Sequence, residues 1–186
     1  MAETYSFDAV YEEAINSLID LKSPNLIPNA SLSHARSLIR ALVSKVAIDE
    51  YIGIFTGSLS EDAFGPADTV EAFKTCLSKG IKLKLLFHEK PDHNIVNNAF
   101  YKSVILDTRY KNNIEVRYLK PENANENLKH LLTVNDSAFR LETDHNNTKA
   151  YAAFNNKDVG TSVREYFSTL FNSTLSEKMG IACLAI

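Results

Sequence analysis

Five stretches of the chain repeat apolar residues at the three- and four-residue spacing of an amphipathic helix. They cover residues 5–21, 33–48, 68–79, 95–110 and 157–172. Ser31 or Ser33 is placed to cap the second of these helices, and Gly80 is placed to end the third. The pattern therefore predicts a domain that is rich in helices with one apolar face each.

Shorter runs have the apolar continuity or the alternation of β-strands. They cover residues 51–57, 81–87, 114–119 and 150–154. The order strand, helix, glycine and strand across residues 51–87 predicts a right-handed βαβ unit with parallel strands. Residues 23–29 contain two prolines and predict a loop wrapped over the domain, and residues 58–66 predict a polar loop.

Residues 129–142 predict a β-hairpin that carries the best candidate site. A strand over 131–134 runs into the polar pair Asn135-Asp136, and a second strand follows over 137–142. An Asn-Asp pair tolerates the positive φ of a tight two-residue turn. The second strand alternates, with Ala138, Arg140 and Glu142 on one face and Phe139 and Leu141 on the other.

The alternation of these elements predicts an α/β fold, a mixed β-sheet flanked by helices on both faces. With 186 residues, the chain is long enough for a single domain with a real core. We expect an extra N-terminal helix and a wrapping loop over 1–32, a core over 33–172 and an apolar tail over 173–186. The tail ends in the apolar residues 181–186.

Composition narrows the class of protein. The formal charge is −3 and there is no basic tail, which argues against a large non-specific nucleic-acid footprint but leaves a local basic groove open. Cys76 and Cys183 lack metal or redox spacing, so we expect reduced thiols in a cytoplasmic protein. The N-terminus has no signal-peptide pattern, and no apolar run approaches the ~18 residues of a membrane span.

Three pieces of the sequence carry a family resemblance. They are residues 52–58 with the helix and the strand Lys79–Leu86 that follow, the His130 hairpin, and Phe154-Asn155-Asn156 before the terminal helix. Over roughly residues 33–172 this order resembles the phospholipase D-like superfamily. The resemblance implies a mixed sheet flanked by helices and domains that meet in pairs. A chain with one such domain is therefore expected to form a homodimer, or to dock on a protein partner through its apolar tail.

The catalytic signature of that family is His-x-Lys-x4-Asp, in which histidines attack phosphorus and protonate the leaving oxygen, lysine binds phosphate and aspartate orients the imidazole. No register of this chain restores the triplet. With His130 in the histidine place, Leu132 and Ser137 fill the others; with Asp136 in the aspartate place, Lys129 and Leu131 do; with Asn135 there, Leu128 takes the histidine place and His130 the lysine place. The fold can persist without the activity.

Each candidate residue has a functional and a plainer interpretation. His130 is a phosphate-contacting or catalytic histidine, or a strand-edge histidine bonded to a loop. Arg140 and Glu142 form an anion site, or a solvated pair of modest worth. The remaining candidates are either site residues or ordinary turn and loop residues: Asn135, Asp136, Asn155 with its neighbour Asn156, Ser58 with Thr56 and Ser60, and the pair Asp144-His145.

Metal and cofactor motifs are not evident in the sequence. His88 and His93 lie five residues apart across Pro91 and have no third ligand nearby, so we expect no metal site and no cofactor. Basic and aromatic residues are interleaved near Tyr110 and Tyr118, which suits either single-strand binding or ordinary solvation.

Two functional hypotheses follow. The first is a pseudoenzyme: a non-catalytic phospholipase D-like domain that acts as a dimeric binding or assembly module and recognises a phosphate-bearing ligand such as nucleic acid or a nucleotide. The alternative is a metal-independent phosphodiesterase or nuclease, with His130 as the nucleophile and the His130 of a dimer mate as the acid. A bacterial or phage-related role is expected by analogy with stand-alone domains of this kind.

Overall fold

The structure is a computed structural model, which describes residues 7–29, 31–125, 127–144 and 149–180. Its centre is one eight-stranded mixed sheet in the order β1-β7-β6-β5-β2-β3-β4-β8. The strands are β1 Ile27–Asn29, β2 Tyr51–Thr56, β3 Lys82–Phe87, β4 Ile114–Leu119, β5 Leu131–Thr133, β6 Phe139–Asp144, β7 Lys149–Ala153 and β8 Ser176–Lys178. The α-helices are α1 Phe7–Asp20, α2 Leu32–Lys45, α3 Glu61–Phe64, α4 Ala67–Ser78 and α5 Lys157–Asn172.

The sheet combines a parallel and an antiparallel part. Strands β2, β3 and β4 are parallel, and the predicted unit of β2, α4 and β3 is confirmed. The other neighbours pair antiparallel, so that β5 runs against β2, and β6, β7 and β1 continue outward from it. At the opposite edge β8 pairs antiparallel with β4. The junction of β2 with β3 and β5 is therefore where the direction of the sheet changes.

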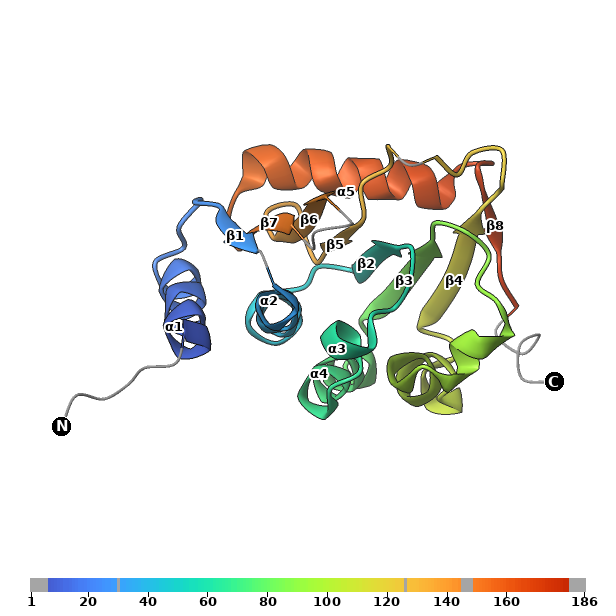
Figure 1. The fold of residues 1–186 in the computed structure, drawn as a ribbon, viewed down its shortest axis with the longest axis horizontal. Helices are drawn as coiled ribbons and strands as arrows, with labels where there is room; N and C mark the ends of the chain where they lie inside the picture. The colour runs from blue at the N-terminus through green and yellow to red at the C-terminus, as the bar shows by residue number, and fades with distance from the viewer. Residues whose placement is uncertain (1–6, 30, 126, 145–148, 181–186) are drawn as a thin grey trace.

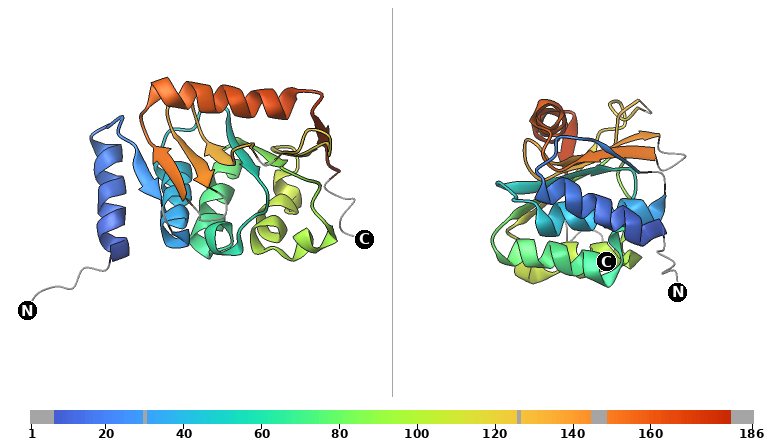
Figure 2. Two further views of the ribbon diagram at one scale, coloured as in Figure 1. Left: turned by 45° about the horizontal axis from the view of Figure 1, so that its top comes forward. Right: turned by 90° about the vertical axis from the view of Figure 1, so that its left-hand side faces the viewer.

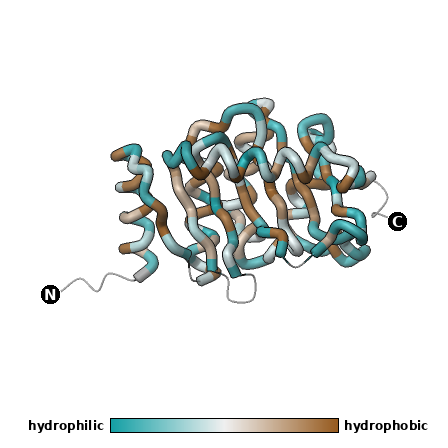
Figure 3. The backbone as a smooth tube through the Cα atoms, turned by 90° about the horizontal axis from the view of Figure 1, so that it is seen from above, coloured by the Kyte–Doolittle hydropathy of each residue, from teal (hydrophilic) through white to brown (hydrophobic). Residues whose placement is uncertain are grey.

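Helices cover both faces of the sheet, as predicted (Figure 1). One face packs on α2, α3 and α4 through a large apolar cluster that includes Leu38, Phe73 and Phe100. The other face packs on α5, through a smaller cluster that includes Phe139 and Phe167. Figure 3 looks onto the α5 side, where the apolar colour gathers on the strands under the helix and polar loops border the sheet.

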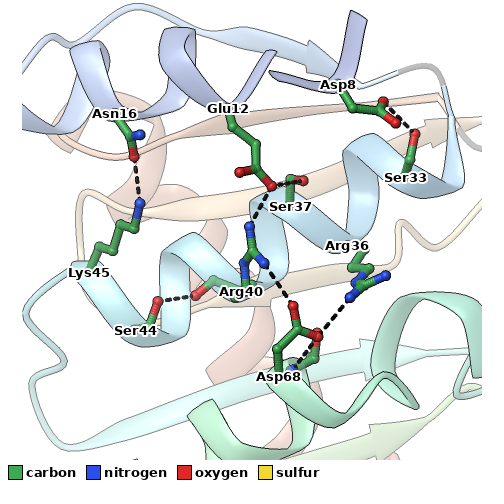
Figure 4. A network of polar contacts seen from close by, with 11 residues as sticks. Asp8, Glu12, Asn16, Ser33, Arg36, Ser37, Arg40, Ser44, Lys45 and Asp68 are labelled. Atoms are coloured by element: carbon green, nitrogen blue, oxygen red, sulfur yellow. Dashed lines mark hydrogen bonds and ion pairs between the residues drawn. The ribbon is translucent and has the colours of Figure 1, made fainter. Parts of the chain in front are cut away.

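Polar contacts fix α1 beside α2, outside the three layers formed by the sheet and the helices on its two faces (Figures 2 and 4). Arg40 of α2 bridges Glu12 of α1 and Asp68 of α4, and Arg36 also reaches Asp68 at 2.9 Å. Burial alone would raise the pKa of Asp68, but the hydrogen bonds from Arg40 and Arg36 outweigh it and lower that pKa. Because these side chains are substantially exposed, each pair contributes about 1 kcal/mol or less.

The single helix predicted over 95–110 is wrong. The structure instead has two 3₁₀ turns, η1 His93–Asn97 and η3 Thr108–Tyr110, around one π-helical turn, η2 Tyr101–Ile105. Asn98 is extended, with a ψ of 129°, and its side-chain oxygen accepts a hydrogen bond from the backbone N–H of Tyr101 at 2.9 Å. Asp107 interrupts the chain in the same way by accepting from the N–H of Arg109. Short polar side chains therefore compete with the helical ladder twice.

Three segments predicted as loop or tail contain regular structure. Residues 23–29 include β1, whose Pro28 suits an edge strand because proline cannot donate to the ladder. Residues 58–66 include the short helix α3, and the segment 173–186 begins with β8. The apolar end of the chain, 181–186, lies outside the described residues.

The predicted hairpin forms, but its turn is longer than two residues. Leu131 pairs with Leu141 and Thr133 with Phe139, so that residues 134–138 make the connection. Neither Asn135 nor Asp136 has a positive φ. The carbonyl oxygen of the Asn135 side chain instead accepts hydrogen bonds from the backbone N–H groups of residues 137 and 138, and its amide donates to the carbonyl of residue 47. Side-chain bonding, not a left-handed backbone, therefore builds this turn.

Candidate functional site

Two histidines meet where the parallel strands end. His88 directly follows β3, and His130 directly precedes β5. Because β5 runs against β2, the start of β5 and the ends of β2 and β3 share one edge of the sheet. There Nδ1 of His88 lies 3.2 Å from Nε2 of His130, which is a hydrogen bond. A change of strand direction is also where open α/β sheets place their ligands.

A carboxylate and a guanidinium extend this pair inward. In the hairpin register Glu142 lies opposite His130, and its N–H donates to the carbonyl of His130 at 2.8 Å. Oε2 of Glu142 is 3.3 Å from Nδ1 of His130, and Oε1 accepts from Nη1 of Arg140 at 2.9 Å. Nε of Arg140 donates to Oδ1 of Asn29 at 2.9 Å. We call the residues His88, His130, Glu142, Arg140 and Asn29 the histidine relay.

The relay is well sheltered from solvent. The side chains of Arg140, His130 and Glu142 are 7%, 15% and 20% exposed. The predicted solvated pair of Arg140 and Glu142 is therefore wrong, because the alternation of β6 directs both side chains toward the face that is covered by α2 and closed at its edge by β1. In such surroundings a charge needs a partner, so Arg140 and Glu142 each depend on the other.

The N-terminal region completes the relay. The hydroxyl of Tyr11 in α1 donates to the carbonyl of Pro28 at 2.8 Å, next to Asn29 in β1. Burial raises the pKa of Tyr11 to about 12, although the nearby charge of Arg140 acts in the opposite direction. Residues 1–32 were predicted only as an extra helix and a wrapping loop. The structure gives them a second role, because β1 supplies the Asn29 that holds Arg140.

Close packing fixes the orientation of both imidazoles. The ring of Phe55 meets the His130 ring edge-on at 5.3 Å between centroids and lies 5.7 Å from the His88 ring. A Cβ atom at Gly57 would stand 2.9 Å from Cε1 of His130, closer than such contacts allow. Glycine at the end of β2 is thus required by the approach of the His130 ring.

The hydrogen-bond pattern limits what each imidazole can do. A carboxylate beside Nδ1 of His130 favours a proton on that nitrogen, and Nε2 then accepts from Nδ1 of His88. Both ring nitrogens of His130 are thereby engaged within the relay. His88 contributes only Nδ1 to the pair, so its Nε2 is the nitrogen that remains outside it.

A hollow of about 340 Å³ adjoins the pair and is lined by Gly57, His88, Glu89, Ala124 and Asn125. A second hollow of about 390 Å³ shares Glu89 and Ala124 with it and continues to Tyr118 and Lys90. His88, rather than His130, is therefore the relay residue on the wall of the accessible space. Each of the two volumes is in the range of small-molecule sites.

Of the other predicted site residues, Asn135, Asp136 and Asn155 lie at the far end of these strands, whereas Ser58 and Asp144 lie at the same edge as the histidine relay but are not members of it. Asn135 and Asp136 are in the turn at the far end of β5, where Asn135 is buried and structural. Asn155 follows β7 at that same far end, and its amide donates to the carbonyl of Lys22. Ser58 is an exposed loop residue after β2. Asp144 ends β6, and its neighbour His145 lies outside the described residues.

The sequence contains a signal for His88 other than its spacing from His93. With His93, which is exposed in η1, His88 suggests only a zinc pair. Its position directly after a parallel strand was the better clue, because such strand ends meet at one edge. The sequence gives no comparable signal for Asn29, because residues 23–29 are predicted as a loop.

Other classes of site are not visible in the described part of the chain. It holds no group of three or more His, Cys, Asp or Glu residues that could bind a metal ion. Cys76 is a free thiol on the buried face of α4, where burial raises its pKa, and Cys183 lies outside the described residues. No helix among the described residues is long and apolar enough to cross a membrane.

No protein-family model matches the chain, and no curated protein matches it significantly. The geometry of the histidine relay and the arrangement of the sheet around it are therefore the basis for inferring a function.

Proposed function

We propose that the chain is a non-catalytic phospholipase D-like domain that binds a phosphate-bearing ligand at the His88–His130 pair. The order of the elements and the mixed sheet with helices on both faces support the resemblance. The position of the pair beside the hollow at the strand ends supports the binding site. In this proposal the domain works as an assembly module, as a homodimer or with a protein partner.

One observation carries the proposal: both ring nitrogens of His130 are engaged, by Glu142 and by His88. A histidine in this state has no lone pair to offer to phosphorus. The pair can hold one additional proton, and the resulting cation complements a phosphate oxygen by a charge-assisted hydrogen bond. The geometry thus favours binding over attack by His130.

Calorimetric titration with inorganic phosphate and with a short single-stranded DNA tests the binding site. His88→Ala should weaken the binding of the phosphate group about tenfold or more, because a hydrogen bond to a charged group contributes about 1.5–3 kcal/mol. His93→Ala is the matched control, since it removes an exposed histidine five residues away. Equal affinity of the His88→Ala variant and the native chain would refute the proposed site.

A second candidate is a metal-independent phosphodiesterase, and the relay itself favours it. A carboxylate behind His130 and His130 behind His88 form a hydrogen-bonded chain that orients the outer imidazole. In this version His88, not His130, would attack phosphorus. Cleavage of labelled DNA and RNA with EDTA present, lost in both His88→Ala and His130→Ala but retained in His93→Ala, would establish this enzyme and overturn the non-catalytic proposal.

Assembly is tested separately by light scattering. The proposal expects the mass of a dimer for the isolated chain, or of a larger complex once its partner is present. A monomer that nevertheless binds phosphate would remove homodimerisation from the proposal and leave the binding site in place.

A further inference from the structure

A third hollow lies away from the two beside His88, at the opposite edge of the sheet, where β3 and β4 begin. Its volume is about 350 Å³, and its wall includes Lys82 and Lys84 of β3, Lys111 from the turn before β4, Glu115 of β4 and Lys178 of β8. Strand order brings these residues together, because β4 stands between β3 and β8. We call this place the lysine hollow.

The lysine hollow carries an excess of positive charge within the described part of the chain. Within the described ranges, none of its four lysines forms an ion pair with a carboxylate. The one carboxylate on its wall, Glu115, is 2.9 Å from Nε of Arg117 and is thus already paired. For a chain with a net charge of −3, this concentration of unpaired lysines is a marked local excess.

A second cationic feature lies beside the lysine hollow, on the α5 face. Nζ of Lys84 is 4.2 Å from the centroid of the Tyr51 ring, and the guanidinium of Arg164 in α5 is 4.1 Å from the same ring. Nη1 of Arg164 is buried and has no hydrogen-bond partner among the described residues. A buried guanidinium nitrogen without a hydrogen-bond partner is rare in folded proteins, because it lowers their stability.

The surroundings of Lys84 disfavour its charged form. Burial lowers its pKa, repulsion from Lys82 and Arg164 acts in the same direction, and attraction to Glu115 and Glu50 opposes the shift. A bound anion would relieve this repulsion and would offer a partner to donors that now have none. The arrangement thus has both the shape and the charge of an anion site.

We propose that the lysine hollow binds a small molecule that carries two or more phosphate groups. Its volume fits one such molecule. Four lysines around one space match several negative charges better than a single phosphate, and lysine is a common ligand of phosphate groups. The site is separate from the histidine relay, and its occupant does not depend on the function proposed there.

Inorganic pyrophosphate is the probe for this site, measured by calorimetry and by chemical-shift changes in backbone amide spectra of the full chain. The native protein should bind it, with the largest shifts at residues 82–84 and 111–115. Lys84→Gln and Lys111→Gln should each weaken binding about tenfold. Lys102→Gln, which removes an exposed lysine from η2 on the opposite face, should bind like the native chain. All variants keep their fold if their amide spectra otherwise match.

Two further measurements make the result decisive. In His88→Ala the chemical-shift changes at residues 82–84 and 111–115 should appear with unchanged affinity, whether or not pyrophosphate also binds at the histidine relay; their loss would overturn the proposal. A single-stranded oligonucleotide that binds while pyrophosphate does not would show a nucleic-acid surface instead. Absence of pyrophosphate binding, or equal weakening by Lys102→Gln, would likewise refute the lysine hollow as a small-molecule site.

Discussion

Charged side chains are arranged in opposite ways at the two edges of the sheet. At the histidine relay each charged side chain has a partner inside the protein: Arg140 contacts Asn29 and Glu142, and Glu142 also approaches His130. At the lysine hollow four lysines face one space with a single carboxylate that is already bound to Arg117. At the relay edge the charged side chains are mostly buried and paired with one another. At the other edge the four lysines have no ion-pair partner among the described residues.

This difference predicts which of the two edges contributes more to the stability of the fold. A buried chain of partners loses stability when one member is removed, because the others remain without compensation. An exposed group of like charges loses little when one member is removed, because water screens the rest. Stability measurements should therefore separate the two edges clearly.

Removal of the guanidinium from the relay should have the largest effect. Arg140→Ala removes the hydrogen bonds that Glu142 and Asn29 accept from the guanidinium and should lower the free energy of unfolding by about 2–4 kcal/mol. Arg36→Ala is the matched control, since its ion pair with Asp68 is substantially exposed and should cost less than about 1 kcal/mol. Urea unfolding measures both. Similar losses in the two variants would contradict the closed relay.

A change at Gly57 should displace the relay without deleting any of its members. Gly57→Ala places a methyl group against the His130 ring and should cost about 1–2 kcal/mol by overpacking. His130→Ala opens space for that methyl group, so the added cost of Gly57→Ala should vanish in the double variant. A double-mutant cycle by urea unfolding gives this coupling, and additive losses would show that the two residues do not meet.

Tyr11 tests the outer support of the relay. Tyr11→Phe removes the hydrogen bond to the carbonyl of Pro28 and should cost about 1 kcal/mol at neutral pH. The pKa of Tyr11 is raised to about 12, above its ordinary value, so the contribution of this group is intact below pH of about 10 and declines as pH rises toward 12. The native chain should therefore lose stability more steeply than Tyr11→Phe across this interval. Parallel alkaline denaturation curves would be evidence against the buried position of Tyr11.

The lysine hollow should give the smallest effect. Lys111→Gln removes one of the like charges and should raise the free energy of unfolding by a few tenths of a kcal/mol at low salt, with no change near 1 M salt. Thermal unfolding at both ionic strengths measures it. A destabilisation of more than about 1 kcal/mol would mean that Lys111 has a structural partner.

Periodicity predicted most elements of the fold but not their interruptions. The strands at 51, 82 and 114 and the helices of the core follow from apolar spacing that the tertiary structure does not override. The helix over 95–110 failed because Asn98 and Asp107 use their side chains to bond the backbone. The positive φ expected at Asn135 failed for a related reason, since its side chain satisfies the turn by itself.

The site was predicted only in part, because it is assembled across the sheet. His130, Arg140 and Glu142 are local to one hairpin and were identified from that pattern. His88 comes from a strand end about forty residues earlier, and Asn29 comes from an edge strand that reads as loop. Burial of Arg140 depends on α1 and β1, which no local alternation reveals.

The most direct test follows the imidazole nitrogens of the five histidines by NMR while inorganic phosphate is added. The proposal predicts that the signals of His88 and His130 shift together with a common midpoint, since they share one hydrogen bond, while those of His93 stay unchanged. Signals of His88 and His130 that do not respond, or that move no more than those of His93, would contradict the phosphate site at the histidine relay.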